Sequence, residues 1–181
     1  MRLFLDIDGV LAQFMKKSCE THGKPGYMAQ KWDYFEDWGL TTAEFWDKID
    51  AIEGWWDDLE LYDNALDLIK LVEKYDPNFK FLSAPHNSPC CYSGKFKLIK
   101  DLGYNPSRRM ILTASKEELA FPGNVLIDEG PPNIEKFTDW GGEAILYPAT
   151  WNDNRDKINV QLEYTENCLK DIQIKFDERG I

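Results

Sequence analysis

Two aspartates near the start of the chain, Asp6 and Asp8, follow a short apolar run. Residues two apart in an extended segment point the same way, about 6–7 Å from each other, so both carboxylates converge on one small volume. Like charges this close favour a divalent cation, and their hard oxygen atoms suit Mg²⁺. Gly9 then lets the backbone turn away and lets a ligand approach. The simpler interpretation is a strand end with two solvated acids.

A second acidic pair, Asp128 and Glu129, ends another apolar run at residues 124–127. A folded protein does not bury charges at a strand end without a partner, because removing a charge from water is costly. Open α/β sheets bind ligands at the carboxyl ends of their strands. Two acid-tipped strands in one parallel sheet therefore favour a metal site shared by both pairs.

Three further side chains are candidates for contact with an anion. The Ser83 hydroxyl follows an apolar run, Lys95 lies near the start of a predicted helix, and Lys116 follows another apolar run. Helix N-termini attract anions, and a lysine there strengthens the attraction. The simpler interpretation of each is an ordinary strand-end serine or a solvated surface lysine.

The short, continuous apolar runs that carry these groups are typical of buried strands in a parallel sheet. With helical segments between the runs, the sequence predicts an α/β fold in which a Rossmann-like parallel sheet is flanked by helices. The expected strands are residues 3–7, 79–82, 110–113, 124–127 and 143–147.

Residues 14–75 contain many aromatic residues and no convincing strand, and Thr41 and Glu44 form a capping-box pattern at the start of a helix within them. We expect this segment to be a small helical cap over the sheet edge. The α/β core would then comprise residues 1–13 and 76–154, and residues 155–181 would form a C-terminal helical tail packed on the core.

Composition limits the classes of partner. The chain of 181 residues has a formal net charge of −11, which repels polyanions, so we expect no binding to duplex nucleic acid or to an anionic membrane surface. No apolar run is long enough to cross a membrane, and we expect no signal peptide, because the first expected strand lies at the start of the sequence. The four cysteines lack CxxC spacing and fit reduced thiols, so we expect a cytoplasmic protein.

Together, these motifs resemble the haloacid dehalogenase (HAD) superfamily, and within it the chain is most similar to the 5′(3′)-deoxyribonucleotidase family. That family's DxDGVLAD pattern matches residues 6–12 and departs at Gln13. Its paired aromatics at the junction of cap and core correspond to residues 54–60, and its IDDRPDNI segment corresponds to residues 127–134. The likeness extends to about Asn154.

The resemblance implies a fold with a HAD core and a Mg²⁺-dependent phosphatase activity. Asp6 would attack phosphorus and form an aspartyl-phosphate, while Asp8 would act as general acid and base. The cation would be held by Asp6, the backbone carbonyl of Asp8 and a carboxylate from Asp128 or Glu129. The side chains implied to bind phosphate are Ser83, Lys95 and Lys116.

For the substrate, the resemblance implies a deoxyribonucleoside monophosphate, with the rings of Phe14, Trp55 and Trp56 placed to stack on a nucleobase. Packing within the cap is the simpler interpretation of each ring. Two alternatives remain open: the same chemistry on a sugar phosphate or other small phosphomonoester, and a receiver-like phosphate-binding module without turnover. Many relatives form homodimers, although no stretch of this sequence defines such an interface.

Overall fold

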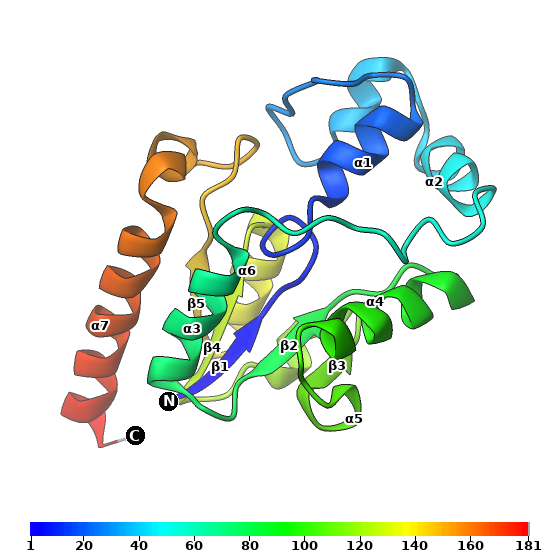
Figure 1. Ribbon diagram of the computed structural model, residues 1–181. Helices are drawn as coiled ribbons and strands as arrows, with labels where there is room; N and C mark the ends of the chain where they lie inside the picture. The colour runs from blue at the N-terminus through cyan, green and yellow to red at the C-terminus, as the bar shows by residue number, and fades with distance from the viewer. Residues whose placement is uncertain (181) are drawn as a thin grey trace.

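The computed structural model describes residues 1–180 and contains a five-stranded parallel sheet in the order β3-β2-β1-β4-β5 (Figure 1). This confirms the predicted α/β fold with a Rossmann-like sheet. Leu5 lies opposite Phe81 in β2 and opposite Ile127 in β4, so three strands end at the same edge. The strands are β1 (Arg2–Leu5), β2 (Lys80–Ser83), β3 (Met110–Leu112), β4 (Asn124–Asp128) and β5 (Glu143–Leu146).

Side chains alternate between the two faces of this sheet, and both faces are covered. Phe4 and Leu126 pack with Phe137 of α6 (Pro131–Asp139), next to η2 (Lys116–Leu119). Leu3, Leu5 and Ile127 belong to the larger cluster on the other face. The helices that contribute to this second face are α3 (Ala65–Tyr75), α4 (Pro89–Asp101) and α7 (Gln161–Arg179). In the chain, the short element α5 (Pro106–Arg109) lies between α4 and β3, and η3 (Arg155–Val160) directly precedes α7.

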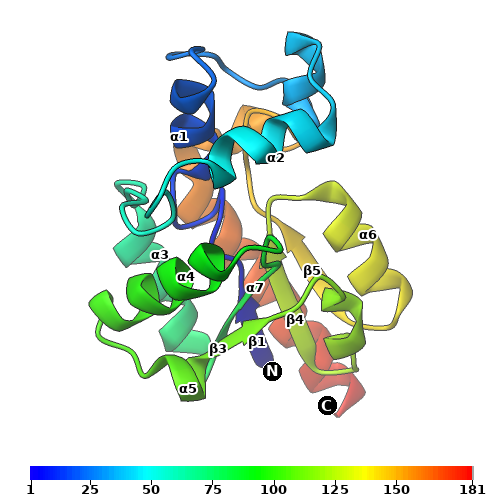
Figure 2. The ribbon, with the colours of Figure 1, turned by 90° about the vertical axis from the view of Figure 1, so that its right-hand side faces the viewer.

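Above the carboxyl ends of the strands lies a separate helical region that contains α1 (Phe14–Thr21), η1 (Tyr34–Trp38) and α2 (Thr42–Asp50) (Figures 1 and 2). The predicted capping box is present at α2: the Thr41 Oγ1 accepts from the Glu44 N–H, and the Glu44 carboxylate accepts from the Thr41 N–H. We call the segment of residues 14–60 the lid.

One helix lies elsewhere than the sequence grouping suggests. Residues 14–75 were assigned together to the cap, but α3, at the end of this range, contacts β1 and α7 beside the sheet. Leu68 and Val72 of α3 are fully buried in the same cluster as Leu3 and Leu5. Its apolar stripe is therefore buried by the sheet. Among residues 1–180, no helix combines the length and apolar character needed to cross a membrane.

Candidate active site

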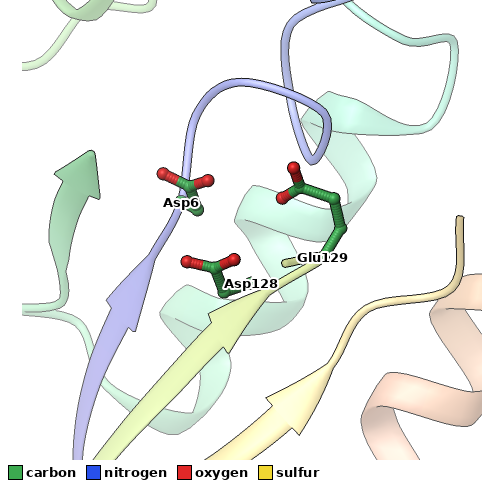
Figure 3. Close-up of side chains that lie close together, drawn as sticks. All are labelled: Asp6, Asp128 and Glu129. Atoms are coloured by element: carbon green, nitrogen blue, oxygen red, sulfur yellow. The ribbon is translucent and has the colours of Figure 1, made fainter. Parts of the chain in front are cut away.

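Three carboxylates meet at the edge where β1 and β4 end (Figure 3). Asp6 follows β1, Asp128 ends β4 and Glu129 comes next. Because β1 and β4 are parallel neighbours in register, these positions lie side by side. One carboxylate oxygen from each residue lies within 4.8 Å of the others, and all three side chains are buried. The sequence-based prediction that the two acidic pairs share one volume therefore holds for these three residues.

Asp8 points to a different partner. Its Oδ2 accepts a hydrogen bond from the Lys95 ammonium, and that ammonium also donates to the Ser83 Oγ at 2.9 Å. Lys95 and Ser83 are each 1% exposed, whereas the Asp8 side chain is 20% exposed. The Asp8 carboxylate thus lies outside the three-acid cluster, and metal binding through its backbone carbonyl stays a prediction.

Lys116, expected to bind phosphate, lies between two of the acids. Its Nζ is 2.8 Å from the Asp6 Oδ1 and 2.6 Å from the Asp128 Oδ2. Burial lowers the pKa of Lys116, but the two carboxylates outweigh this and raise it above its usual range. Asp128 also accepts from the Gly130 N–H at 2.8 Å and from the Asn133 Nδ2 at 3.0 Å. A protonated Lys116 therefore lies beside the three acids, and hydrogen bonds from Gly130 and Asn133 hold Asp128 in place.

Glu129 is the least satisfied member of the cluster. Its Oε2 is buried without a hydrogen-bond partner among the described residues. Burial raises the pKa of Glu129 well above its ordinary value, and the charges of Asp128 and Asp6 add to the effect. A bound cation would compensate this buried acid, since burying an unpaired charge is costly. The oxygen-only donor set and the unpartnered Oε2 thus fit a hard divalent cation.

Gly9 creates the space that the longer acid occupies. Its backbone has φ +79°, and a Cβ added there would lie 2.5 Å from the Glu129 Oε1. The positive φ favours glycine at this turn, and the absence of a Cβ leaves room for the Glu129 carboxylate.

A cavity of about 360 Å³ opens between the acids and the lid. Its floor includes Asp6, Glu129, Lys116 and Ser83, so two of the three predicted phosphate contacts reach it, whereas Lys95 is not among the lining residues. Aromatic rings from the lid line much of the opposite side: Phe14, Trp32, Tyr34, Phe35, Phe45, Trp46 and Trp56. A site with charged groups at one end and flat apolar walls at the other fits a ligand with an anionic group and a ring.

The two expected tryptophans differ in position. Trp56 lines the cavity and stacks on Phe14 with ring centroids 5.5 Å apart, so two of the three predicted aromatic residues meet there. Trp55 is turned into the lid, where its Nε1 donates to the Thr21 Oγ1 at 2.8 Å and Lys17 lies 5.1 Å from its ring centroid. The structure does not bring Trp55 to the candidate site.

The sequence reasoning missed a contact between the lid and the sheet side of the cavity. The ring of His86 stacks on Trp46 at 4.1 Å, and the His86 Nε2 lies 2.8 Å from the Asp50 Oδ2. Trp46 and Asp50 are four residues apart on α2 and so share a face. His86 comes three residues after Ser83, the last residue of β2. The i, i+4 spacing of Trp46 and Asp50, together with a histidine near the end of the expected strand, is the sequence pattern that could have predicted this contact.

Comparison of the sequence with models of known families and with curated proteins finds no match. Several solved structures are similar. A hydrolase from Streptococcus pneumoniae aligns with a TM-score of 0.51 at 13% identity, covering 82% of this chain and 92% of that one. The likeness is one of fold. It shows that this α/β arrangement is also that of a hydrolase.

Two other solved structures align more loosely. A phosphonoacetaldehyde hydrolase-like protein from Oleispira antarctica has a TM-score of 0.49 at 13% identity, covering 99% of this chain and 85% of that one. A HAD-family enzyme from Bacteroides thetaiotaomicron, in complex with magnesium and inorganic phosphate, has a TM-score of 0.45 at 17% identity, with 85% and 97% covered.

Proposed function

We propose that the protein is a Mg²⁺-dependent phosphatase of the HAD superfamily that removes phosphate from deoxyribonucleoside monophosphates. The observation that carries this proposal is the buried cluster of Asp6, Asp128 and Glu129 with Lys116, at the foot of an aromatic cavity. The hydrolase fold and the family resemblance of the motifs support it.

The carboxylates of Asp6, Asp128 and Glu129 would hold the cation. When bound, Mg²⁺ would neutralise phosphate charge and hold the phosphoryl group near the attacking carboxylate. The buried Glu129 would lose its proton on binding, because its carboxylate then gains the partner that it lacks.

The chemistry assigns one step to each aspartate. A carboxylate oxygen of Asp6 attacks phosphorus, so that an aspartyl-phosphate bond forms as the ester P–O bond breaks. Asp8 gives its proton to the leaving alkoxide and then takes a proton from the attacking water. Water attack breaks the aspartyl-phosphate bond, releasing inorganic phosphate and restoring Asp6. Lys95 orients the Asp8 carboxylate through their hydrogen bond.

The remaining polar groups would stabilise charge in the transition state. The Lys116 ammonium already lies 2.8 Å from the Asp6 Oδ1, next to the expected position of the phosphoryl oxygens. The Ser83 hydroxyl lines the same cavity. In a chain of net charge −11, the Lys116 ammonium and the bound cation would permit an anionic substrate to bind. The lid would limit access of water to the aspartyl-phosphate.

The rings of Phe14, Trp46 and Trp56 favour a nucleotide over a sugar phosphate. Each ring lines the cavity, and base–aromatic stacking contributes about 1–3 kcal/mol per base in other proteins. A sugar ring lacks the planar aromatic face that a nucleobase would present to these rings.

The direct test is phosphate release from dUMP or dTMP with Mg²⁺, with the Asp6→Asn variant as control. We expect release by the wild type and none above background by the variant. Equal rates in the two proteins would refute the catalytic assignment. A panel that includes sugar phosphates separates the substrate classes, and binding of Mg²⁺ and beryllofluoride without turnover would indicate a non-catalytic module.

A further inference from the structure

The buried ammonium of Lys95 has three N–H donors, and side chains account for two of them. One donates to the Asp8 carboxylate and one to the Ser83 hydroxyl. Lys95 is 1% exposed, so water has little access to the third. The ring of Trp56 also lies beside this ammonium, with its centroid 5.1 Å from the Lys95 Nζ. This is within the range of a cation–π interaction, which is stronger when the cation is removed from water.

The backbone fixes the ring in this position. Gly94, directly before Lys95 on α4, contacts Trp56 so closely that an added Cβ would lie 2.5 Å from the Trp56 Cβ and 2.6 Å from its carbonyl oxygen. Only glycine permits this approach. Trp56, at the junction between lid and core, thus packs against α4 at the residue that directly precedes Lys95.

We propose that Trp56 is a positioning residue whose ring face holds the Lys95 ammonium against Asp8 and Ser83, in addition to lining the cavity. This inference rests on the proposed function for its effect on turnover. It gives Trp56 a role that does not depend on the base of the substrate, because Lys95 orients the acid–base aspartate whichever alkoxide leaves.

The chain supplies its own matched control. Trp55 lies under a lysine in the same way, with the Lys17 Nζ 5.1 Å from its ring centroid, and it is as buried as Trp56. Lys17, however, donates to the Trp55 carbonyl oxygen within the lid and contacts none of the acids that would do the chemistry. Trp55 packs edge-on against Trp56, with ring centroids 5.0 Å apart, but Lys95 lies over the Trp56 ring, so only the loss of Trp56 removes a direct contact with Lys95.

The kinetic test compares Trp56→Leu, Trp56→Phe and Trp55→Leu on dUMP and on glycerol 2-phosphate, which has no ring. We expect Trp56→Leu to lower kcat by roughly tenfold or more on both substrates. Trp56→Phe, which keeps an aromatic face, should retain much of the wild-type kcat. Trp55→Leu should leave both kcat values within about twofold. If Trp56→Leu slows dUMP turnover but not glycerol 2-phosphate turnover, the ring only stacks on the base and the inference fails.

A second test needs no turnover. The Trp56 ring current should shift the NMR signals of the Lys95 ε-methylene upfield, with Lys95→Met used to assign them. We expect the shift to vanish in Trp56→Leu, to persist in part in Trp56→Phe and to be unchanged in Trp55→Leu. Lys95 signals unchanged in folded Trp56→Leu would overturn the positioning role. An inactive wild type with the expected NMR shifts would instead refute the proposed function and leave the contact confirmed.

Discussion

The edge of the sheet and the lid contribute to the same cavity in different ways. At the edge, Asp6 and Asp128 come from neighbouring strands, and the register of β1 and β4 alone brings them together. In the lid, Phe14, Trp46 and Trp56 come from α1, α2 and the loop that follows, and they meet only after those segments have packed. A parallel sheet therefore places its chemistry by topology, whereas the lid places its rings by side-chain packing.

If this contrast is right, the largest effects follow changes at the edge. Asp8→Asn removes the proposed acid and base, and we expect kcat for dUMP to fall by roughly 10²–10⁴-fold. With p-nitrophenyl phosphate, whose leaving group needs no proton, a burst of about one p-nitrophenol per protein should precede the slow hydrolysis of the aspartyl-phosphate. Stopped-flow absorbance measures it. A variant that turns over both substrates at the wild-type rate would exclude the role of Asp8.

Lys116→Met tests the charge balance of the cluster. The substitution leaves Asp6 and Asp128 buried without their cation, and breaking a buried pair in this way typically costs about 3–5 kcal/mol. We expect a loss of this order in the free energy of unfolding, measured by urea denaturation in EDTA, and partial recovery with Mg²⁺. Unchanged stability in EDTA would show that the ion pairs do not hold the cluster together.

The pH dependence of stability tests the proton that the buried Glu129 keeps. Burial raises the pKa of Asp128 as well, so the Glu129→Gln variant is needed to isolate the contribution of Glu129. Because its pKa is raised in the folded state, the folded protein keeps a proton that the unfolded chain releases above about pH 4.5. The free energy of unfolding in EDTA should therefore fall as pH rises from 4.5 through the raised pKa, by up to about 1.4 kcal/mol per pH unit for this group. Urea denaturation across this range should show a flatter profile for Glu129→Gln, and an identical profile would contradict the assignment.

Changes in the lid should affect selectivity more than chemistry. Trp46 lines the cavity but does not contact the acids, so Trp46→Leu should lower kcat/KM for dUMP by about tenfold relative to glycerol 2-phosphate. Steady-state kinetics on both substrates measures the ratio. An equal loss on both would mean that the lid supports the edge, and the two regions would then not be separable.

The smallest effect is expected where the lid meets the strand-end loop. The Asp50 and His86 side chains are 36% and 19% exposed, so solvent screens their pair. A double-mutant cycle of Asp50→Asn and His86→Gln should give a coupling energy below about 1 kcal/mol. A coupling of several kcal/mol in urea denaturation would show that this contact, rather than ring packing, holds the lid closed.

The sequence was most informative about the edge. Two apolar runs tipped by acids predicted the parallel sheet and the meeting of Asp6, Asp8, Asp128 and Glu129. Three of these carboxylates meet because β1 and β4 are parallel neighbours in register, whereas Asp8 lies beyond the end of β1 and accepts from Lys95 instead. That Lys116 would bridge two of these acids could not be read from the chain, since a loop lysine has no periodicity that fixes its direction.

The lid was less predictable. Adjacent tryptophans point in different directions, and nothing in the Trp55–Trp56 pair tells which ring faces the cavity and which donates to Thr21. The grouping of α3 with the cap was wrong in placement for a related reason: its amphipathic stripe shows that one face is buried, but not whether the lid or the sheet buries it.

The account rests on one cation shared by Asp6 and the end of β4, and anomalous scattering from a crystal grown with Mn²⁺ and phosphate tests this most directly. We expect a single anomalous peak within about 2.5 Å of carboxylate oxygens from Asp6 and from Asp128 or Glu129, with phosphate beside it. A peak away from these residues, or none at saturating Mn²⁺, would contradict the proposed site.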